Sequence, residues 1–433
     1  MTKLQAIRGM HDVLMHEIPK WQFVEESIKN IINQYGYKEI RLPILEKTEL
    51  FKQTIGDNTD IVSKEMYSFD DKNKPSLTLR PEGTAGCVRA GIEHGLFHNK
   101  IQRLWYMGPM FRYEKPQKGR QRQFHQLGVE AFGLEGPDVD VEQIMMCNRI
   151  WKKLCIKNIN LEINSLGSAQ SRLNYRNILV DYFASHKNQL DDNSLIRLEK
   201  NPLRILDSKN PDMKSLIMNA PTIDEYLDSE SSNHFTELKE MLNNGNIKYN
   251  VNQKLVRGLD YYGKTVYEWT TCELGAQDTV CAGGRYDNLV ENHGSSPTPA
   301  VGFAIGIERL LELIDPEKIT DSSIPHIYLL VSGSKPKEHG LLLAEEIRDK
   351  APFIKILTNC GEGSLKSQFK KADKSGAEIA LILGEDELEK KQLTVKYLRE
   401  EKPQITVKWN EITSFLNKTL LNSNKFNKII ICR

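Results

Sequence analysis

The C-terminal part of the chain alternates strand-like apolar runs with helical ones. The runs "HIYLLVSG", "FIKILTN" and "EIALILG" are typical of buried strands, and the two segments between them, "EHGLLLAEEIRDK" and "LKSQFKKADKSGA", have helical periodicity. Strands and helices that alternate in this way form a βαβαβ unit around a parallel sheet. Two further strand-like runs, "QLTVKYL" and "ITVKW", follow it. We therefore predict that residues 325–433 fold as a separate α/β domain with its own core.

The preceding residues predict a larger domain in two sheet-forming parts. Short strand-like runs fill residues 63–133 and return at 255–286, and "AVGFAIGIERLLELI" is typical of a strand that continues into a helix. Between these parts the pattern becomes helical, with segments such as "SRLNYRNILVDYFASHKNQL". The sequence therefore predicts an α+β fold in which a helical insertion at 168–245 separates the sheet-forming parts 1–167 and 246–320.

Composition excludes several classes of protein. The 433 residues have a net charge of +1, so contacts with nucleic acid have to come from local patches. The longest apolar runs, such as "IYLLV", are far shorter than a membrane span, and the N-terminus has no apolar core of signal-peptide length. The seven cysteines include no CxxC pair and no cluster with zinc spacing. We expect a cytoplasmic protein with reduced cysteines, no structural metal and no membrane association.

The strongest local signal is the basic segment "FRYEKPQKGRQRQFHQLGVEAFG" at 111–133. Two strand-like arms flank the turn "KPQKG", so the segment predicts a β-hairpin. The turn and its flanks contain one acid, Glu114, and five basic residues, which are Arg112, Lys115, Lys118, Arg120 and Arg122. A solvated basic turn would explain these charges, but arginine is also well suited to bidentate phosphate contacts. On the second arm, Gln126, Gly128 and Glu130 alternate along the strand and share one face, where polar groups need a polar partner such as a ligand.

Three other segments carry polar groups beside predicted strands. In "LVRGLDYYGKTVYEW", Arg257, Tyr261 and Tyr262 precede an alternating run, and a pairing of Arg257 with Asp260 that braces a turn is the structural alternative. "LTLRPEGTAG" is typical of a strand followed by a helix start, and the glycines of "CAGGRYDNLV" allow backbone to approach a ligand closely. The chain has no Walker A motif and no G-x-G-x-x-G between a strand and a helix. Arginine side chains, rather than a glycine-rich helix start, would therefore hold a phosphate.

Together these segments resemble the motifs of bacterial-type histidyl-tRNA synthetases, a family of class II aminoacyl-tRNA synthetases, over essentially the whole chain. "YKEIRLPILE" resembles motif 1 of that class, whose role is dimerisation, the basic hairpin resembles motif 2, and "AVGFAIGIERL" resembles motif 3. "LVRGLDYYGKTVYEW" and "AGGRYD" resemble the two signatures of the histidine enzymes. The resemblance implies a class II catalytic domain with an antiparallel sheet and a helical insertion, followed by a C-terminal α/β (βαβαβ) anticodon-binding domain.

The resemblance also implies roles for individual residues. Arg112 and Arg257 would be catalytic, and both would bind ATP together with Arg309. The residues that would bind histidine are Glu82, Gly83, Thr84, Gln126, Glu130, Tyr261, Tyr262 and Tyr286. The residues that would contact the acceptor end of the tRNA are Lys118, Arg120 and Arg122. No motif identifies the residues that read the anticodon.

The implied activity is that of a homodimeric histidine–tRNA ligase. L-Histidine and ATP, the latter with Mg²⁺, would form histidyl-adenylate and pyrophosphate, and histidine would then be transferred to the 3′ end of tRNA-His. Arginines suit this chemistry because a carboxylate has to attack the α-phosphate, and guanidinium groups neutralise the charge that spreads in the transition state. Glu82 and Glu130 suit the other end of the substrate, where an ammonium and an imidazole N–H need acceptors.

Three other interpretations compete with this one. The regulatory subunit of ATP phosphoribosyltransferase has the same catalytic fold without the chemistry, but such paralogues usually lack the anticodon domain and lose substrate-site residues. Prolyl and threonyl synthetases share the C-terminal domain type, but "RGLDYY" argues against them. A generic RNA-binding module does not explain the convergent carboxylates.

Overall fold

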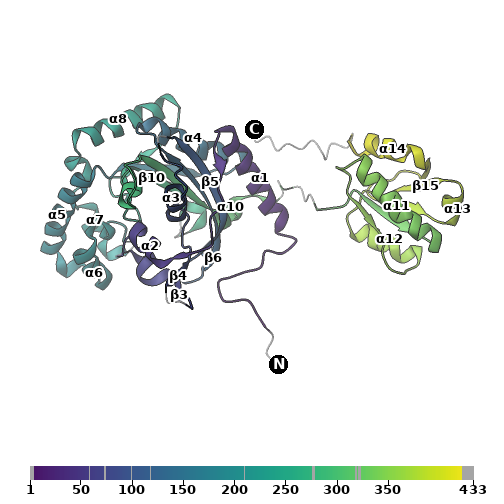
Figure 1. Cartoon of the computed structure of the whole chain (residues 1–433), viewed down its shortest axis with the longest axis horizontal. Coiled ribbons are helices and arrows are strands. Elements are labelled where there is room, and N and C mark those ends of the chain that lie inside the picture. The colour runs from purple at the N-terminus through teal and green to yellow at the C-terminus, as the bar shows by residue number, and fades with distance from the viewer. Residues whose placement is uncertain are drawn as a thin grey trace. The chain divides into compact units, whose positions relative to one another are not determined.

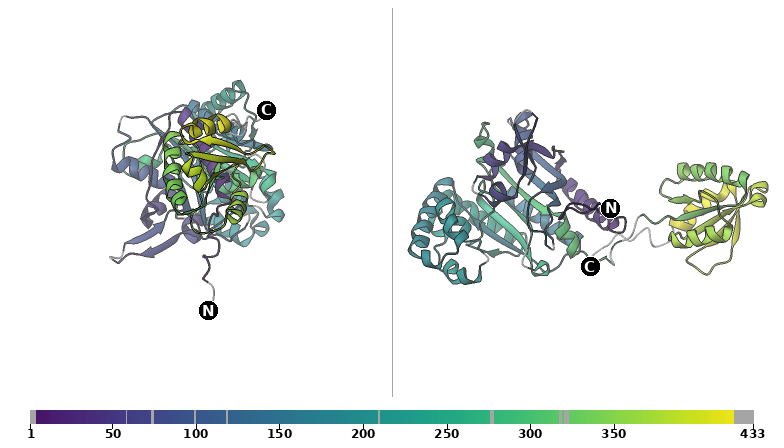
Figure 2. Two further views of the ribbon diagram at one scale, coloured as in Figure 1. Left: turned by 90° about the vertical axis from the view of Figure 1, so that its right-hand side faces the viewer. Right: turned by 90° about the horizontal axis from the view of Figure 1, so that it is seen from below.

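The computed structural model describes residues 4–57, 59–72, 75–98, 100–117, 119–208, 210–275, 278–316, 319 and 323–421. The chain divides into two compact units, Met1–Pro316 and Glu317–Arg433. Figure 1 shows the helices and strands of each unit, and Figure 2 shows them from two further directions. Within the described ranges, no helix combines the length and the apolar composition needed to cross a membrane.

The larger unit is built on an eight-stranded sheet in the order β1-β5-β6-β11-β10-β9-β7-β8. The strands are β1 (Lys38–Glu39), β5 (Gln102–Phe111), β6 (Gln123–Phe132), β7 (Ile159–Ser165), β8 (Asn250–Val251), β9 (Gly263–Thr271), β10 (Thr279–Arg285) and β11 (Ala300–Gly306). The six central strands pair antiparallel, and only the short outer strands β1 and β8 pair parallel with their neighbours. The predicted α+β fold with a largely antiparallel catalytic sheet is confirmed.

Helices pack around this sheet, and a second small sheet lies in the same unit. The helices outside the insertion are α1 (Ile18–Gln34), α2 (Thr48–Ile55), α3 (Thr84–Glu93), α4 (Pro137–Lys153), α9 (Leu289–Asn292) and α10 (Ile307–Leu313). Helix α4 packs against β11. The small antiparallel sheet has the order β2-β4-β3 and is formed by β2 (Leu45–Lys47), β3 (Tyr67–Asp70) and β4 (Ser76–Leu79).

Among the residues that the structure describes, four α-helices lie between β7 and β8 in the chain, where the helical insertion is predicted. They are α5 (Ala169–Ser185), α6 (Asp192–Lys200), α7 (Lys214–Met218) and α8 (Ser229–Asn244). Three of them begin at a capping side chain: Ser168, Asp191 and Asp228 each accept a hydrogen bond from a backbone N–H of the first turn. Figures 1 and 2 show α5, α6 and α7 gathered beside the sheet.

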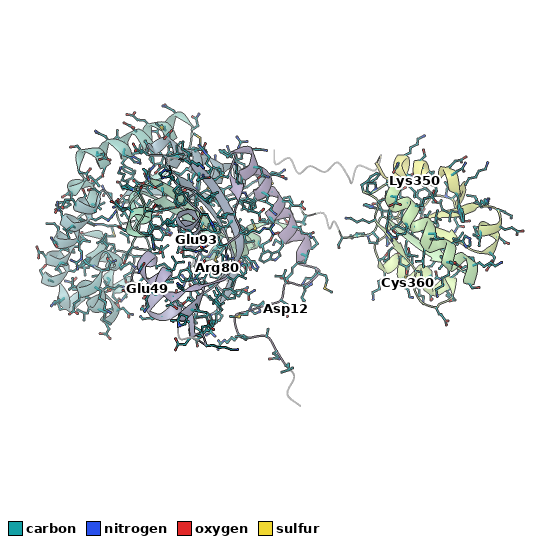
Figure 3. All side chains as sticks on the ribbon, viewed as in Figure 1. Asp12, Glu49, Arg80, Glu93, Lys350 and Cys360 are labelled. Atoms are coloured by element: carbon teal, nitrogen blue, oxygen red, sulfur yellow. The ribbon has the colours of Figure 1, made fainter. Side chains whose placement is uncertain are left out.

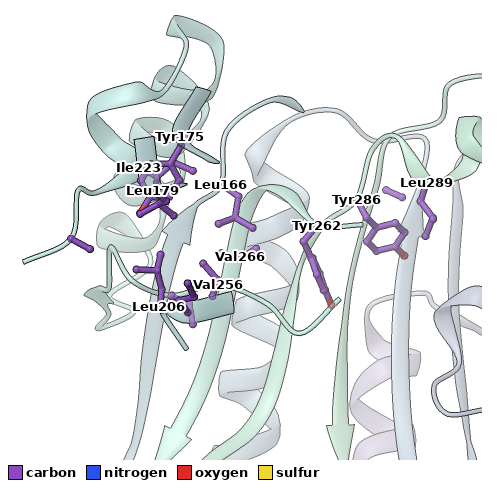
Figure 4. Packing of buried hydrophobic residues seen from close by; sticks show 14 of the residues in the cluster. Leu166, Tyr175, Leu179, Leu206, Ile223, Val256, Tyr262, Val266, Tyr286 and Leu289 are labelled. Atoms are coloured by element: carbon purple, nitrogen blue, oxygen red, sulfur yellow. The ribbon is translucent and has the colours of Figure 1, made fainter. Parts of the chain in front are cut away.

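The insertion shares one hydrophobic core with the sheet. Tyr175 and Leu179 of α5 belong to the same buried cluster as Val266 of β9 and the aromatic residues Tyr262 and Tyr286 (Figure 4). Each of these five side chains is almost completely buried. A shared core of this kind fixes the insertion helices against the strands that carry the predicted site.

The smaller unit contains a five-stranded sheet in the order β13-β12-β14-β15-β16. Its elements are β12 (Ile327–Val331), α11 (Ser334–Lys350), β13 (Ile356–Thr358), α12 (Leu365–Lys374), β14 (Ile379–Leu383), α13 (Glu385–Glu389), β15 (Gln392–Tyr397), β16 (Ile405–Lys408) and α14 (Trp409–Leu421). The first three strands are parallel, and β15 and β16 continue the sheet antiparallel. Figure 3 labels Lys350 at the end of α11 and Cys360 after β13.

Some elements differ from the sequence-based expectation. The segment "YKEIRLPILEKTELF" is expected to be a strand that meets Pro43 and continues into a helix-capable segment. Helix α2 begins at Thr48 as expected, but only two residues pair in β1, and β2 belongs to the other sheet. Proline has no N–H to donate, which interrupts the strand. The alternating run that follows Arg257, Tyr261 and Tyr262 is present as β9 (Gly263–Thr271), and these three residues precede it as expected. Helix α14 follows β16 directly and was not predicted.

Candidate active site

A cavity of about 660 Å³ opens between the central strands and the loops that follow them. Strands β6, β9, β10 and β11 all contribute to its lining. The predicted site residues that line it are Glu82, Thr84, Arg112, Arg120, Gln126, Glu130, Arg257, Tyr261, Tyr262 and Arg309. Residues that are up to 227 positions apart in the sequence are thus brought to one cavity by the fold.

Glu130 is the buried acid of this cavity. Its Oε1 accepts hydrogen bonds from Oγ1 of Thr84 at 2.8 Å and from the phenol of Tyr106 at 3.0 Å, and its Oε2 accepts one from the phenol of Tyr286. Burial raises the pKa of Glu130 to about 8, although these three donors act in the opposite direction. The three hydrogen bonds hold the carboxyl group in one orientation. Because its pKa is raised, the charged carboxylate would be stabilised by a further hydrogen-bond donor or positive charge.

Glu82 lies beside Glu130 at the start of α3. Its two oxygens accept backbone N–H groups of Thr84 at 2.7 Å and Ala85 at 2.9 Å. Acceptors at a helix N-terminus satisfy N–H groups that have no partner within the helix. Burial still raises the pKa of Glu82. Together with Glu130 it makes one end of the cavity acidic.

Glycines make room for the tyrosine that supports Glu130. A Cβ atom on Gly83 or on Gly128 would approach the ring of Tyr106 to 2.1 Å, and one on Gly302 would collide with the carboxylate of Glu130. Gly128 lies directly opposite Tyr106 in the pairing of β5 with β6. Gly83 therefore serves the site by its small size, and it does not line the cavity itself.

Three tyrosines form an aromatic wall next to the acids. The ring centroids of Tyr261 and Tyr262 are 4.6 Å apart, and those of Tyr261 and Tyr286 are 5.5 Å apart. Figure 4 shows Tyr262 and Tyr286 on neighbouring segments of this region. Tyr286 is 1% exposed and is absent from the cavity lining, so it acts from behind Glu130. Tyr261 and Tyr262 line the cavity directly.

Arginines make the other part of the cavity cationic. Arg112 donates from Nε to the carbonyl of Pro81 at 2.8 Å and lies over the ring of Phe124 at 5.2 Å. Arg309 donates to the carbonyls of Gly119 and Thr279. Burial lowers the pKa of Arg309, and the positive charges of Arg120 and Arg112 lower it further by a smaller amount. Guanidinium groups that repel one another in this way form a site for an anion.

Arg257 is held by an acid that the sequence analysis did not single out. Its Nη1 forms an ion pair with Oε1 of Glu268 on β9, and Oγ1 of Thr279 donates to Oε2 of the same glutamate at 2.9 Å. The guanidinium also lies over the ring of Tyr262, 5.3 Å from its centroid. The alternative pairing of Arg257 with Asp260 is wrong: the carboxylate of Asp260 accepts from Asn201 at 2.9 Å.

The basic hairpin residues do not all face the cavity. Arg120 lines it and pairs with Glu114 at 3.0 Å. Arg122 is stacked on the ring of Tyr113, 3.9 Å from its centroid, and lies outside the lining. Lys118 lies outside the described residues. The predicted hairpin itself is present as β5 and β6, whose connecting turn is closed by hydrogen bonds between Gln117 and Arg120.

Sequence reasoning missed residues that support the site. The pairing of β5 with β6 places Tyr106 opposite Gly128, so strand alternation could have indicated it. Glu268 on β9 meets Arg257 and accepts from Thr279 on β10, and these contacts between separate segments are not visible in the sequence. Arg80, labelled in Figure 3, is 6% exposed and donates to the carbonyls of Leu42, Pro43 and Pro109. Arg80 thereby connects the segment before β2, at Leu42 and Pro43, to Pro109 of β5, and no local sequence motif indicates this role.

The described part of the chain contains no group of three or more His, Cys, Asp or Glu side chains that could hold a metal ion. The cavity instead combines two buried carboxyl groups and an aromatic wall with a set of arginines. A zwitterionic ligand with a polar side chain fits the acidic part, and a polyphosphate fits the arginines. Such an arrangement can bring a carboxylate and a phosphate together.

Comparison with known proteins agrees with this chemistry. The family model of histidyl-tRNA synthetase matches residues 9–310, and that of an anticodon-binding domain matches residues 329–419. A curated histidine–tRNA ligase of Hydrogenovibrio crunogenus is 56% identical over 424 residues, which cover 98% of this chain and 99% of that protein.

Solved structures resemble the whole chain as well. The apo histidyl-tRNA synthetase of S. aureus has a TM-score of 0.80 at 33% identity and covers 95% of this chain and 99% of its own. A protein of Bacillus halodurans described as an ATP phosphoribosyltransferase regulatory subunit/histidyl-tRNA synthetase has a TM-score of 0.64 at 21% identity, covering 89% of this chain and 98% of its own, and this shows a shared fold alone. On the match of the family model and the identity to the curated ligase, the chain belongs to the histidyl-tRNA synthetase family.

Proposed function

We propose that this chain is a histidine–tRNA ligase that activates L-histidine with ATP and then transfers it to tRNA-His, and that the cavity described above is its active site. The observation that carries this proposal is the position of Glu130, a buried carboxyl group with three hydroxyl donors, in the same cavity as Arg112, Arg257 and Arg309. The regulatory-subunit alternative does not explain why the cavity keeps both the buried carboxyl groups and the arginines.

At the acidic end, the side chains recognise histidine. Glu130 accepts the imidazole N–H, and Glu82 with Thr84 receives the ammonium group. Gln126, on the same face of β6 as Glu130, adds a polar contact at the cavity wall. Tyr261 and Tyr262 enclose the imidazole ring. A pocket that hydrogen-bonds a polar side chain rejects analogues without it by about 10⁴-fold or more, because buried acceptors would be left unpaired.

At the cationic end, the arginines bind ATP, which enters as its Mg²⁺ complex. The carboxylate of histidine attacks the α-phosphorus, the bond to the bridging oxygen breaks, and pyrophosphate leaves. Arg112 and Arg257 contact the α-phosphate and neutralise the charge that develops on its oxygens. Arg309, already fixed by two backbone carbonyls, holds the more distant phosphates. Fixed cations need no rearrangement during the reaction.

The second step uses the same cavity and the smaller unit. The 3′ end of the tRNA enters beside the hairpin, where Arg120, Arg122 and Lys118 offer phosphate contacts. Residues 1–167 and 246–320 form the catalytic domain, residues 168–245 its insertion and residues 325–433 the anticodon-binding domain. The family match over residues 329–419 supports the last assignment. We also propose that the enzyme acts in the cytoplasm, where tRNA is charged.

The experiment that tests this function is histidine-dependent exchange between ATP and pyrophosphate. With each of the twenty amino acids offered separately to the purified chain, only histidine should drive exchange. Robust exchange with proline or threonine, and none with histidine, would contradict the proposal. Absence of exchange with every amino acid would favour the regulatory-subunit alternative.

We further propose that the chain is a homodimer through the motif 1 region. The support for this proposal is the resemblance of "YKEIRLPILE" to motif 1, together with the exposed neighbouring apolar side chains Ile44 and Leu45 in this region. Light scattering at micromolar concentration should give about twice the chain mass of 49.7 kDa. Leu45→Glu should shift the mass toward that of the monomer. A monomer mass for the unmodified chain would refute this proposal.

A further inference from the structure

The helical insertion lines the active-site cavity through Leu206 and Asp207, and it also binds a neighbouring loop that lines the cavity. That loop, Arg257–Tyr261, contributes four lining residues (Arg257, Gly258, Leu259 and Tyr261) and is called the arginine loop here. It contains no strand pairing of its own. Two insertion residues bind it: Nδ2 of Asn201 donates to Oδ1 of Asp260 at 2.9 Å, and Nη1 of Arg204 donates to the carbonyl of Gly258 at 2.8 Å. The second contact is at the residue next to Arg257.

Arg204 is itself held on more than one side. Its Nη2 forms an ion pair with Oδ2 of Asp60 at 3.1 Å, and its side chain is only 12% exposed. Arg197 pairs with the same carboxylate at 3.3 Å and donates to the backbone carbonyl of Arg204 at 3.2 Å. The guanidinium is planar and rigid, so its Nη1 and Nη2 bonds determine the positions of the two acceptors, the carbonyl of Gly258 and the carboxylate of Asp60, relative to each other. The carbonyl of Gly258 is therefore fixed relative to Asp60.

The other side of the arginine loop rests on α2 and the turn after it. The backbone N–H of Asp260 donates to the carbonyl of Ile55 at 3.2 Å, and Leu259 packs against the cluster that contains Phe51 and Ile55. Gly56 has a φ of +100°, and a Cβ there would come within 2.5 Å of the carboxylate of Asp260. The loop thus lies between helix α2 on one side and the insertion on the other.

We propose that Arg204 is a positioning residue for adenylate formation, through which the insertion sets the place of the loop that carries Arg257 and Tyr261. This inference rests on the proposed function. Without Arg204, the carbonyl of Gly258 loses its charged donor, and the middle of the loop is held by the contacts to α2 and to Asn201. The pairing of Arg257 with Glu268 holds the guanidinium but not the backbone at Gly258. A displacement of about 1 Å at a catalytic group can slow a reaction about 10²-fold. The insertion therefore contributes to the first chemical step, before any tRNA binds.

The test is single-turnover formation of histidyl-adenylate by the full chain without tRNA. The first-order rate constant reports the geometry of competent sites, whereas the amplitude reports how many sites are competent. Arg204→Ala should lower the rate constant about 10- to 100-fold at saturating histidine and ATP and leave the amplitude near that of the wild type. Arg204→Lys, which keeps a charged donor without the planar fork, should give an intermediate rate constant.

Arg197→Ala is the matched control, because Arg197 shares Asp60 but donates nothing to the arginine loop among the contacts described. Its rate constant should stay within about twofold of the wild type. If Arg204→Ala lowers only the amplitude, or if Arg197→Ala slows the reaction equally, the positioning role is wrong. If the wild type forms no adenylate with histidine, the proposed function fails and this inference fails with it.

Discussion

Replacing Arg257 by alanine should slow single-turnover adenylate formation by about 10²–10³-fold and leave histidine affinity nearly unchanged. The reason is that the guanidinium stabilises charge that appears on the α-phosphate only in the transition state. Its pairing with Glu268 fixes it in the apo cavity, so it is already oriented when ATP arrives. The measurements are the rate constant of adenylate formation and the dissociation constant of histidine, determined on the same preparation.

Loss of stability has to be separated from loss of catalysis in this variant. The side chains of Arg257 and Glu268 are 13% and 17% exposed, and removal of one partner from a buried pair costs about 3–5 kcal/mol. Arg103→Ala is a suitable control because it breaks the ion pair between Arg103 and Glu142 away from the cavity. This control should lower the melting temperature without changing the rate constant. A rate constant for Arg257→Ala within a few-fold of the wild type would show that Arg257 is structural.

The sequence allowed prediction of much of the fold because its patterns are local. Alternation along "QFHQLGVEAFG" predicted that Gln126 and Glu130 share one face of a strand, and β6 carries both into the cavity. The alternation of strands and helices in the C-terminal region predicted the order β12 to β14 with its two intervening helices. In both cases residues within one or two elements determine the outcome, so periodicity is a sufficient guide.

What could not be predicted depends on contacts between distant segments. The structural alternative paired Arg257 with Asp260, three residues away, whereas the fold brings Glu268 to Arg257 and gives Asp260 to Asn201 in the insertion. Tyr286 carries a polar hydroxyl and was expected at the ligand, but the packing around Glu130 places it behind that acid. Buried polar groups find partners wherever the tertiary structure offers them, and sequence spacing does not report that choice.

Replacing Glu130 by glutamine should lower kcat/KM for histidine by about 10²–10³-fold in ATP–pyrophosphate exchange. The substitution keeps the size of the side chain but removes the negative charge and turns one oxygen into an N–H₂ group. That group would face the hydroxyl donors that now converge on the carboxylate. Tyr286→Phe is the graded comparison, because it removes one donor and leaves the carboxyl group in place. Its effect should be about tenfold.

The pH dependence gives a second and independent readout of Glu130. Burial raises the pKa of Glu130 from 4.5 to about 8, so this group stabilises the apo fold below pH 4.5 and that contribution is lost as the pH rises through about 8. The carboxylate is the form that accepts the imidazole N–H. Consequently kcat/KM for histidine, which reports ionisations of the free enzyme, should rise with pH through an apparent pKa near 8.

In Tyr286→Phe the inflection should move to higher pH, because the hydrogen bond from Tyr286 lowers the pKa of Glu130. In Glu130→Gln the inflection should disappear, and its persistence there would assign the ionisation to another group and remove Glu130 from the recognition of the imidazole.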